Sequence, residues 1–220
     1  MTSIIDTNQV TTPQIEHLQA DNIETVIRYL SAINPTGDKC IKPAEAQALS
    51  DAGIRLALVH EGYGDFLTHD GAFPAISAQA GKRDATFCLN YAPTVGAPKG
   101  ACIYFAVDTD ASPSQISQYV LPYFAAIEAV LMNSGYQIGV YGSGAVCKAV
   151  IGAKSAQLAW LSQSMGWTGS RAYLALKPPE LVLLQGAVTR LANLDCDTDT
   201  AFGDFGDFLP FEQPELDLTS

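Results

Sequence analysis

The sequence predicts an α/β protein, a small and somewhat degenerate (β/α)8 barrel, and three observations lead to this fold class. Short apolar segments alternate with helix-like segments along most of the chain. Eight of the apolar segments read as strands, which is the number that closes such a barrel. The 220 residues suffice for one domain with a sizeable core. We expect the barrel over residues 1–209 and a C-terminal tail at residues 210–220.

Each predicted strand is a short, continuous apolar run, a pattern typical of parallel strands that are buried on both faces. In chain order the strands are residues 4–6, 24–30, 55–61, 102–108, 137–143, 157–163, 181–186 and 192–197. Parallel neighbours need a crossover connection, which is usually a helix. The order of segments therefore predicts a parallel sheet covered by helices.

Helix-like segments separate most of these strands, and several carry signals at their ends. They are residues 11–20, 42–53, 73–95, 112–135 and 144–153. Thr12 is a candidate N-cap, Gly53 closes the second segment, and Ser112 is a candidate cap of the fourth. The late connections at residues 165–179 and 186–191 are too short, or too rich in glycine and proline, to predict good helices.

Composition and charge restrict the class of partner. Apolar residues make up 48% of the chain and charged residues 16%, as in a globular protein rather than a disordered one. The formal net charge is −11, and the 12 lysine and arginine residues are not clustered. Nucleic acid and anionic membranes attract proteins through basic patches, so we expect neither as the partner. No segment reaches the roughly 18 apolar residues that a membrane-spanning helix needs.

The cysteine residues and the N-terminal residues indicate in which cellular compartment the protein is made. The five cysteines are widely spaced and form no CxxC pair, so neither a zinc site nor a disulfide framework is predicted. Cys102 and Cys196 fall in predicted strands, where we expect reduced core residues. The first residues have neither a basic nor an apolar signal region, so we expect synthesis in the cytoplasm without a signal peptide.

Polar residues, most of them acidic, stand at the predicted carboxyl ends of several strands. They are Asp6, Arg28, Glu61, Asp108, Asp110, Gln185, Asp195 and Asp197. In a (β/α)8 barrel these strand ends meet at one rim, and that rim carries the active site. Residues that are far apart in the sequence are therefore expected to line one cleft.

A cleft of this kind suits acid–base chemistry. Several carboxyl groups in a site of low dielectric constant raise the pKa of at least one of them, so that one holds a proton while another is ionised. Glycoside hydrolysis uses such a pair, an acid for the leaving oxygen and a carboxylate as base, nucleophile or charge stabiliser. Aromatic residues near the same rim could stack on sugar rings: Tyr29, Tyr63, Phe66, Tyr141, Trp160 and Trp167.

Simpler interpretations exist for single residues. Asp110 is also a candidate cap for the helix that follows, and Asp6 with Arg28 could form a structural ion pair. Two aspartate-rich segments resemble calcium loops but lack the central glycine and final glutamate of an EF-hand. We predict no cofactor and no metal, although a divalent ion fits the geometry of Asp6, Glu61, Asp108 and Asp195.

Seven segments together resemble a known family. They are "IDTNQVTTPQ", "VIRYLS", "KPAEAQALSDAGIRLALVHE", "IYFAVDTD", "YFAAIEAVL", "GYQIGVYGS" and "NLDCD". The combination is similar to the glycoside-hydrolase-like domain first catalogued as domain of unknown function 1906, which is related to the family 25 lysozymes. The resemblance runs from about residue 4 to residue 208. It implies a small (β/α)8 barrel that cleaves a polysaccharide, with the glycan strand of peptidoglycan as the first candidate.

The resemblance also implies roles for residues. Asp108 matches the first acid of the strand-four motif, and Asp110 matches the second, which is a glutamate and the proton donor in family 25 lysozymes. Because aspartate is one methylene shorter, we expect Glu61 as general acid and Asp108 as nucleophile or charge stabiliser, with Asp110 as the competing donor. Asp6 and an acid of strand eight match further family acids. The residues expected to bind substrate are Asp6, Arg28, Tyr63, Tyr141, Trp160, Gln185, Asp195 and Asp197.

The leading hypothesis is a retaining-type muramidase, or a related glycosidase, that needs no metal. A non-catalytic barrel that binds glycan and a metal-dependent phosphodiesterase are the alternatives. A cell-wall hydrolase must reach its substrate outside the cytoplasm, yet no signal peptide is predicted. We therefore expect delivery by a secretion machine, as an antibacterial effector with an immunity protein, or release by a phage lysis system.

Overall fold

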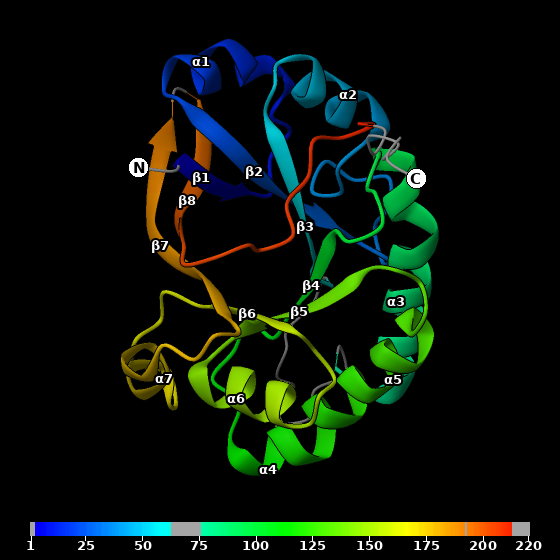
Figure 1. Cartoon of the computed structure of the whole chain (residues 1–220), viewed down its shortest axis with the longest axis vertical. Coiled ribbons are helices and arrows are strands. Elements are labelled where there is room, and N and C mark those ends of the chain that lie inside the picture. The colour runs from blue at the N-terminus through cyan, green and yellow to red at the C-terminus, as the bar shows by residue number, and fades with distance from the viewer. Residues whose placement is uncertain (1–2, 63–75, 192, 213–220) are drawn as a thin grey trace, which may run out of the picture.

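The computed structural model describes residues 3–62, 76–191 and 193–212. Within these residues eight strands form one closed barrel, and neighbours in the sequence are neighbours in the sheet (Figure 1). The strands are β1 (Ser3–Thr7), β2 (Ile23–Leu30), β3 (Arg55–His60), β4 (Cys102–Ala106), β5 (Gln137–Gly142), β6 (Leu158–Leu161), β7 (Leu181–Leu191) and β8 (Leu194–Ala201). The predicted α/β barrel is confirmed.

The prediction of a wholly parallel sheet is wrong at the last strand. Strands β1 to β7 pair in parallel, whereas β8 runs antiparallel to both β7 and β1. The predicted connection at residues 186–191 is in fact the second half of β7, which turns directly into β8. A hairpin needs only a short turn, whereas a parallel crossover needs a dozen or more residues. Asp195 and Asp197 consequently lie in the first half of β8 and not at its end.

Helices pack around the outside of the barrel. They are α1 (Ile15–Ala20), α2 (Pro43–Asp51), α3 (Ala78–Tyr91), α4 (Pro113–Gln115), α5 (Leu121–Leu131), α6 (Gly144–Gly152) and α7 (Ser170–Leu176). Figure 1 shows α3 and α5 side by side on one flank, while the β7–β8 hairpin forms the opposite edge. The helix α7 lies in a connection for which the sequence predicted no good helix. The residue just before it, Gly169, has φ +75°, a left-handed backbone conformation that glycine adopts without strain.

The observed helix ends show which of the predicted capping residues cap a helix. Ser112 caps α4 as predicted, in a capping box in which its Oγ accepts from Gln115 N and the Gln115 side chain accepts from Ser112 N. The segment then passes through a π-helical turn at Ile116–Val120. Pro122, the second residue of the following helix, cannot donate to a preceding carbonyl, which accounts for the irregular turn. Thr12 is not a cap, because it is the first residue of a 3-10 turn (Thr12–Gln14).

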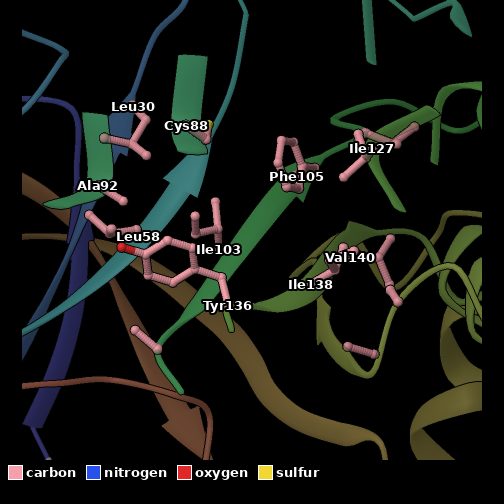
Figure 2. Close-up of a cluster of buried hydrophobic side chains, with 14 of the residues drawn as sticks. Leu30, Leu58, Cys88, Ala92, Ile103, Phe105, Ile127, Tyr136, Ile138 and Val140 are labelled. Carbon is pink, nitrogen blue, oxygen red and sulfur yellow. The ribbon is translucent and has the colours of Figure 1, made fainter. Parts of the chain in front are cut away.

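Apolar side chains pack in two layers that the barrel wall separates. The inner layer fills the barrel and includes Ile27, Tyr104 and Trp160. The larger outer layer lies between the strands and the helices. In Figure 2, Leu58 and Val140 from the strands lie in one cluster with residues of the outer helices. The alternation of strand residues between the two layers follows from the period of two in a β-strand. All five cysteines are free and buried, as predicted for Cys102 and Cys196.

Arg28 belongs to the outer layer and is fully buried. Its guanidinium pairs with Glu45 on α2, with Nε to Oε1 at 2.8 Å, and also donates to backbone carbonyls such as that of Thr7. Glu45 Oε1 accepts from Thr11 as well, so both buried charges have several partners. The alternative interpretation, an ion pair between Asp6 and Arg28, is therefore wrong, since Arg28 pairs with Glu45. A substrate-binding role is wrong as well, because no part of the Arg28 side chain reaches the surface.

We predict that Arg28→Met lowers the free energy of unfolding by about 3 kcal/mol or more, because it leaves the buried Glu45 carboxylate without its counter-charge. Chemical denaturation measures this change. The matched control is Arg190→Met, since Arg190 and Asp195 are 63% and 60% exposed and lie 3.6 Å apart. Exposed pairs contribute about 1 kcal/mol or less. Equal losses in the two variants would contradict the structural role of Arg28.

Candidate active site

A pocket of about 340 Å³ opens at the rim where the parallel strands end. Its lining comes from the strands, or from the segments that directly follow them, all around the barrel. The lining residues are Asn8, Tyr29, Lys39, Val59, Glu61, Ala106, Asp108, Tyr141, Trp160, Ser162, Gln163, Ser164, Gln185 and Asp197. This is the rim at which (β/α)8 barrels place their active sites.

Asp6 lies below the pocket and is 2% exposed. Its Oδ1 accepts from the Tyr29 hydroxyl at 3.0 Å, and its Oδ2 accepts from Gln185 Nε2 at 3.1 Å. Burial raises the pKa of Asp6 to about 7, with a further increase from the charge of Asp197, although the bond from Gln185 opposes the shift. Asp6 is therefore a proton-holding group within the physiological pH range.

Gln185 connects Asp6 to the pocket wall. Its Nε2 also donates to Asp197 Oδ2 at 3.2 Å, while its Oε1 accepts from the Tyr141 hydroxyl at 2.7 Å. The Tyr141 oxygen in turn lies 3.5 Å from Asp108 Oδ1. A continuous polar chain therefore runs from the buried carboxyls to the exposed carboxyl of Asp108.

Glu61 and Asp108 are the two carboxyls at the pocket mouth. Glu61 directly follows β3 and forms an ion pair with Lys39, which also lies over the Tyr29 ring. Burial raises the pKa of Glu61 even though Lys39 lowers it, and the charge of Asp108 adds to the increase. Asp108 is exposed, yet partial desolvation of its carboxyl still raises its pKa, against the effects of Tyr141 and Lys39. Both carboxyls therefore keep a proton to a higher pH than an ordinary glutamate or aspartate does.

Asp199 extends this acidic group into the barrel and was not foreseen from the sequence. It is 6% exposed, and its Oδ1 accepts from the Trp160 indole at 2.9 Å. Burial, followed by the charge of Asp6, raises the pKa of Asp199 well above its usual value. Trp160 is 1% exposed, so it forms the floor of the pocket and not an open platform for a sugar ring.

The other candidates from the sequence lie elsewhere. Asp110 is exposed and does not line the pocket, because its Oδ1 accepts from Thr168 N at 2.7 Å. It does not cap the following helix either, since Ser112 does so. Asp195 is also outside the pocket and contacts Gln9 and Arg190. Tyr63 and Phe66 lie outside the described residues.

Some pocket residues carried no sequence signal. Lys39, Asn8 and Ser164 lie in loops, where no periodic pattern marks them. Asp199 could have been found from the spacing of Asp195, Asp197 and Asp199, because alternate residues of a strand share one face. Among residues 3–62, 76–191 and 193–212, no three His, Cys, Asp or Glu side chains are grouped so that they could hold a metal ion.

We predict that Asp6 makes stability depend on pH. Its folded pKa of about 7 lies above the ordinary value of 3.8, so the folded state holds the proton more tightly than the unfolded state. This contribution is complete below about pH 4 and is lost as the pH rises through about 7. As the pH rises from about 4 to about 7, the free energy of unfolding should therefore fall less in Asp6→Asn than in the wild type. Chemical denaturation at several pH values measures this difference. Asp195→Asn, at an exposed position, is the control, and equal slopes for Asp6→Asn and wild type would contradict the assignment.

Comparison with known proteins agrees with the fold. The uncharacterised protein FadG of Bacillus subtilis (strain 168) is 29% identical over 170 residues, which are 75% of this chain and 28% of FadG. The chain thus spans little more than a quarter of that relative. The Tat-secreted protein Rv2525c of Mycobacterium tuberculosis superposes with a TM-score of 0.75 at 21% identity, covering 94% of this chain and 98% of that one.

An autolysin and a muramidase share the same fold at lower similarity. The modular autolysin LytC of Streptococcus pneumoniae has a TM-score of 0.59 at 13% identity, covering 90% of this chain and 46% of LytC. A muramidase of Trichobolus zukalii has a TM-score of 0.54 at 12% identity, covering 93% and 95% of the two chains. Over its described residues, this chain forms no helix long and apolar enough to cross a membrane.

The family match is more specific than these superpositions. Residues 16–178, well over half of the chain, match the family described as "Rv2525c-like, glycoside hydrolase-like domain". This agrees with the resemblance carried by the strand-end motifs of the sequence. The chain belongs to the Rv2525c-like family of glycoside hydrolase-like domains.

Proposed function

We propose that this barrel hydrolyses the glycosidic bonds of a polysaccharide, and that the substrate is the glycan strand of bacterial peptidoglycan. The observation that carries the proposal is the pair Glu61 and Asp108 at one pocket mouth, each with its pKa raised by burial. Glycoside hydrolysis requires two carboxyls of different protonation around one bond. A pocket lined mainly by polar side chains also suits a hydroxyl-rich ligand.

The chemistry follows from these two groups. One carboxyl donates its proton to the glycosidic oxygen as the bond to the anomeric carbon breaks. The other is ionised and stabilises the positive charge that develops on the sugar, either as a nucleophile or by activating water. Lys39 helps to keep one carboxylate charged, and the Asp6–Gln185–Tyr141 chain holds the wall of the pocket in place.

We propose peptidoglycan as the glycan substrate because proteins with the same fold include an autolysin and a muramidase. LytC, one of the structural neighbours, has been crystallised with a synthetic peptidoglycan ligand, and another neighbour is a muramidase. At 11–13% identity these likenesses support the fold alone, so an N-acetylmuramidase specificity is part of the proposal. Substrate binding by Tyr63, Asp195 and Asp197, which the sequence predicts, stays part of the proposal.

A peptidoglycan hydrolase acts outside the cytoplasm. We therefore include secretion, or delivery to the periplasm as an antibacterial effector with an immunity protein, in the proposal. The Tat-secreted neighbour Rv2525c fits an extracytoplasmic role for this fold. Directing the protein to the periplasm of a susceptible bacterium should be toxic. Absence of toxicity, together with a neighbouring gene whose product does not bind the protein, would argue against the effector role.

We predict that Glu61→Gln and Asp108→Asn each lower the release of reducing ends from peptidoglycan at least 100-fold, since general acid–base groups contribute about 10² to 10⁴ in rate. Both variants should fold, because each amide is close in size to the carboxyl that it replaces. Circular dichroism and thermal unfolding verify this in the same preparations.

Asp110→Asn is the matched control. The Asp110 side chain lies outside the pocket and accepts from Thr168 N, so we expect this variant to keep most of the activity. Full activity in both Glu61→Gln and Asp108→Asn would show that the carboxyl pair is not catalytic. Tight binding of peptidoglycan fragments without turnover by the wild type would instead indicate a glycan-binding barrel.

A further inference from the structure

The two ends of the Gln185 amide are distinguished by their surroundings. Gln185 is 7% exposed, and its Nε2 lies within hydrogen-bond distance of two carboxyls, those of Asp6 and Asp197. A flipped amide would turn its carbonyl oxygen toward both, and an ionised Asp197 has no hydrogen to donate to it. Asp6 and Asp197 are direct partners in the β1–β8 register, so the backbone itself presents both carboxyls to one nitrogen.

The acceptor end of the amide takes the single hydroxyl hydrogen of Tyr141. The Tyr141 oxygen is 2.7 Å from Gln185 Oε1 and 3.5 Å from Asp108 Oδ1. The first distance is that of a good O–H···O bond, and the second is at the outer limit. A phenol carries one hydrogen, so a Tyr141 hydroxyl that donates to Gln185 Oε1 presents only lone pairs to Asp108 and cannot also donate across the 3.5 Å contact.

We propose that Gln185 is a positioning residue that acts through Tyr141 and makes Asp108, not Glu61, the carboxyl that holds the catalytic proton. A protonated Asp108 can donate to the Tyr141 oxygen, whereas an ionised Asp108 meets a lone pair. In this proposal Glu61 is the ionised partner, because it forms the ion pair with Lys39. The catalytic meaning rests on the proposed glycosidase function, and the roles are the reverse of those favoured by the sequence.

Other charged groups face Asp108 from the surrounding elements. Glu61 follows β3, Lys39 lies in the loop after β2, and Asp197 lies on β8. A Tyr141 hydroxyl that donates to Asp108 would favour its ionisation, and the positive charge of Lys39 favours it as well. Because burial outweighs both of these effects, the pKa of Asp108 stays raised. The Ser162 hydroxyl also interacts with Tyr141, but it is neutral at all working pH values.

The sign of a pKa change tests the proposal. Carbon-13 NMR of aspartate carboxyl groups, with the Asp108 signal assigned from Asp108→Asn, follows this pKa in the whole protein. Tyr141→Phe removes the acceptor oxygen, so the pKa of Asp108 should fall by about half a pH unit or more. If Tyr141 instead donates to an ionised Asp108, the same substitution raises the pKa. A rise, or no change, overturns the proposal.

Tyr173→Phe is the matched control for removing a buried hydroxyl. In the described part of the chain the Tyr173 hydroxyl has no hydrogen-bond partner, and Tyr173 does not line the pocket. The pKa of Asp108 should be unchanged in this variant. If the pKa of Asp108 falls as much in Tyr173→Phe as in Tyr141→Phe, a general change of the fold, and not the loss of the Tyr141 oxygen, lowers this pKa.

Gln185→Leu gives a second measurement. It frees the Tyr141 hydrogen to turn toward Asp108, so the pKa of Asp108 should again fall. A folded Gln185→Leu protein with an unchanged or raised Asp108 pKa contradicts the positioning role. Because this variant also removes the amide between Asp6 and Asp197, Tyr141→Phe decides the matter if Gln185→Leu does not fold.

Activity separates this proposal from the proposed function. If the wild type cleaves peptidoglycan, the alkaline limb of its pH profile should move to lower pH in Tyr141→Phe, because the general acid loses its proton earlier. A wild type without turnover contradicts the glycosidase proposal and leaves the NMR test of Asp108 intact. An alkaline limb that stays in place contradicts the role of Asp108 as the acid, even where turnover is found.

Discussion

The antiparallel pairing of β8 with β1 closes the barrel, and the pocket depends on that closure. It sets Asp6 opposite Asp197 across the seam, although the two residues lie near opposite ends of the sequence. Side chains of directly paired residues are about 5 Å apart, so two carboxyls there repel each other unless a donor or a proton intervenes. Gln185 supplies the donor, and the raised pKa of Asp6 supplies the proton. Without the pairing of β8 with β1, the Gln185 amide and the carboxyls of Asp6 and Asp197 would not be close enough to bind one another.

The hairpin that replaces the last crossover brings Gln185 to this seam. Gln185 pairs in register with Asp199, and the pairing then shifts before Val188 meets Asp197. Such bulges redirect side chains and are frequent beside active sites. Here the shift brings one amide within reach of both Asp6 and Asp197. The polar chain from Asp6 to Asp108 is thus a consequence of how the barrel ends, in a hairpin and not a helical crossover.

Much of this arrangement could be predicted from local patterns. Continuous apolar runs locate the strands, and the acids at the ends of β1, β3 and β4 lie at the rim because parallel strands share one direction. The direction of β8 is not encoded in its apolar pattern, although the short connection before it left no room for a crossover helix. Arg28 was misplaced because strand position alone does not say which face a side chain takes. Its neighbour Ile27 fills the barrel, so Arg28 must point outward. Lys39 lies in a loop, where contacts are set by tertiary packing.

The central claim is that this pocket adds water across a glycosidic bond of peptidoglycan. Mass spectrometry of fragments released in ¹⁸O-labelled water tests it directly, with the Glu61→Gln variant treated in parallel. The account predicts wild-type fragments with a reducing N-acetylmuramic acid end that carries one heavy oxygen atom, and almost none from the variant. Unchanged peptidoglycan after wild-type treatment, fragments with anhydro ends that lack the heavy oxygen, or equal cleavage by both proteins would contradict it.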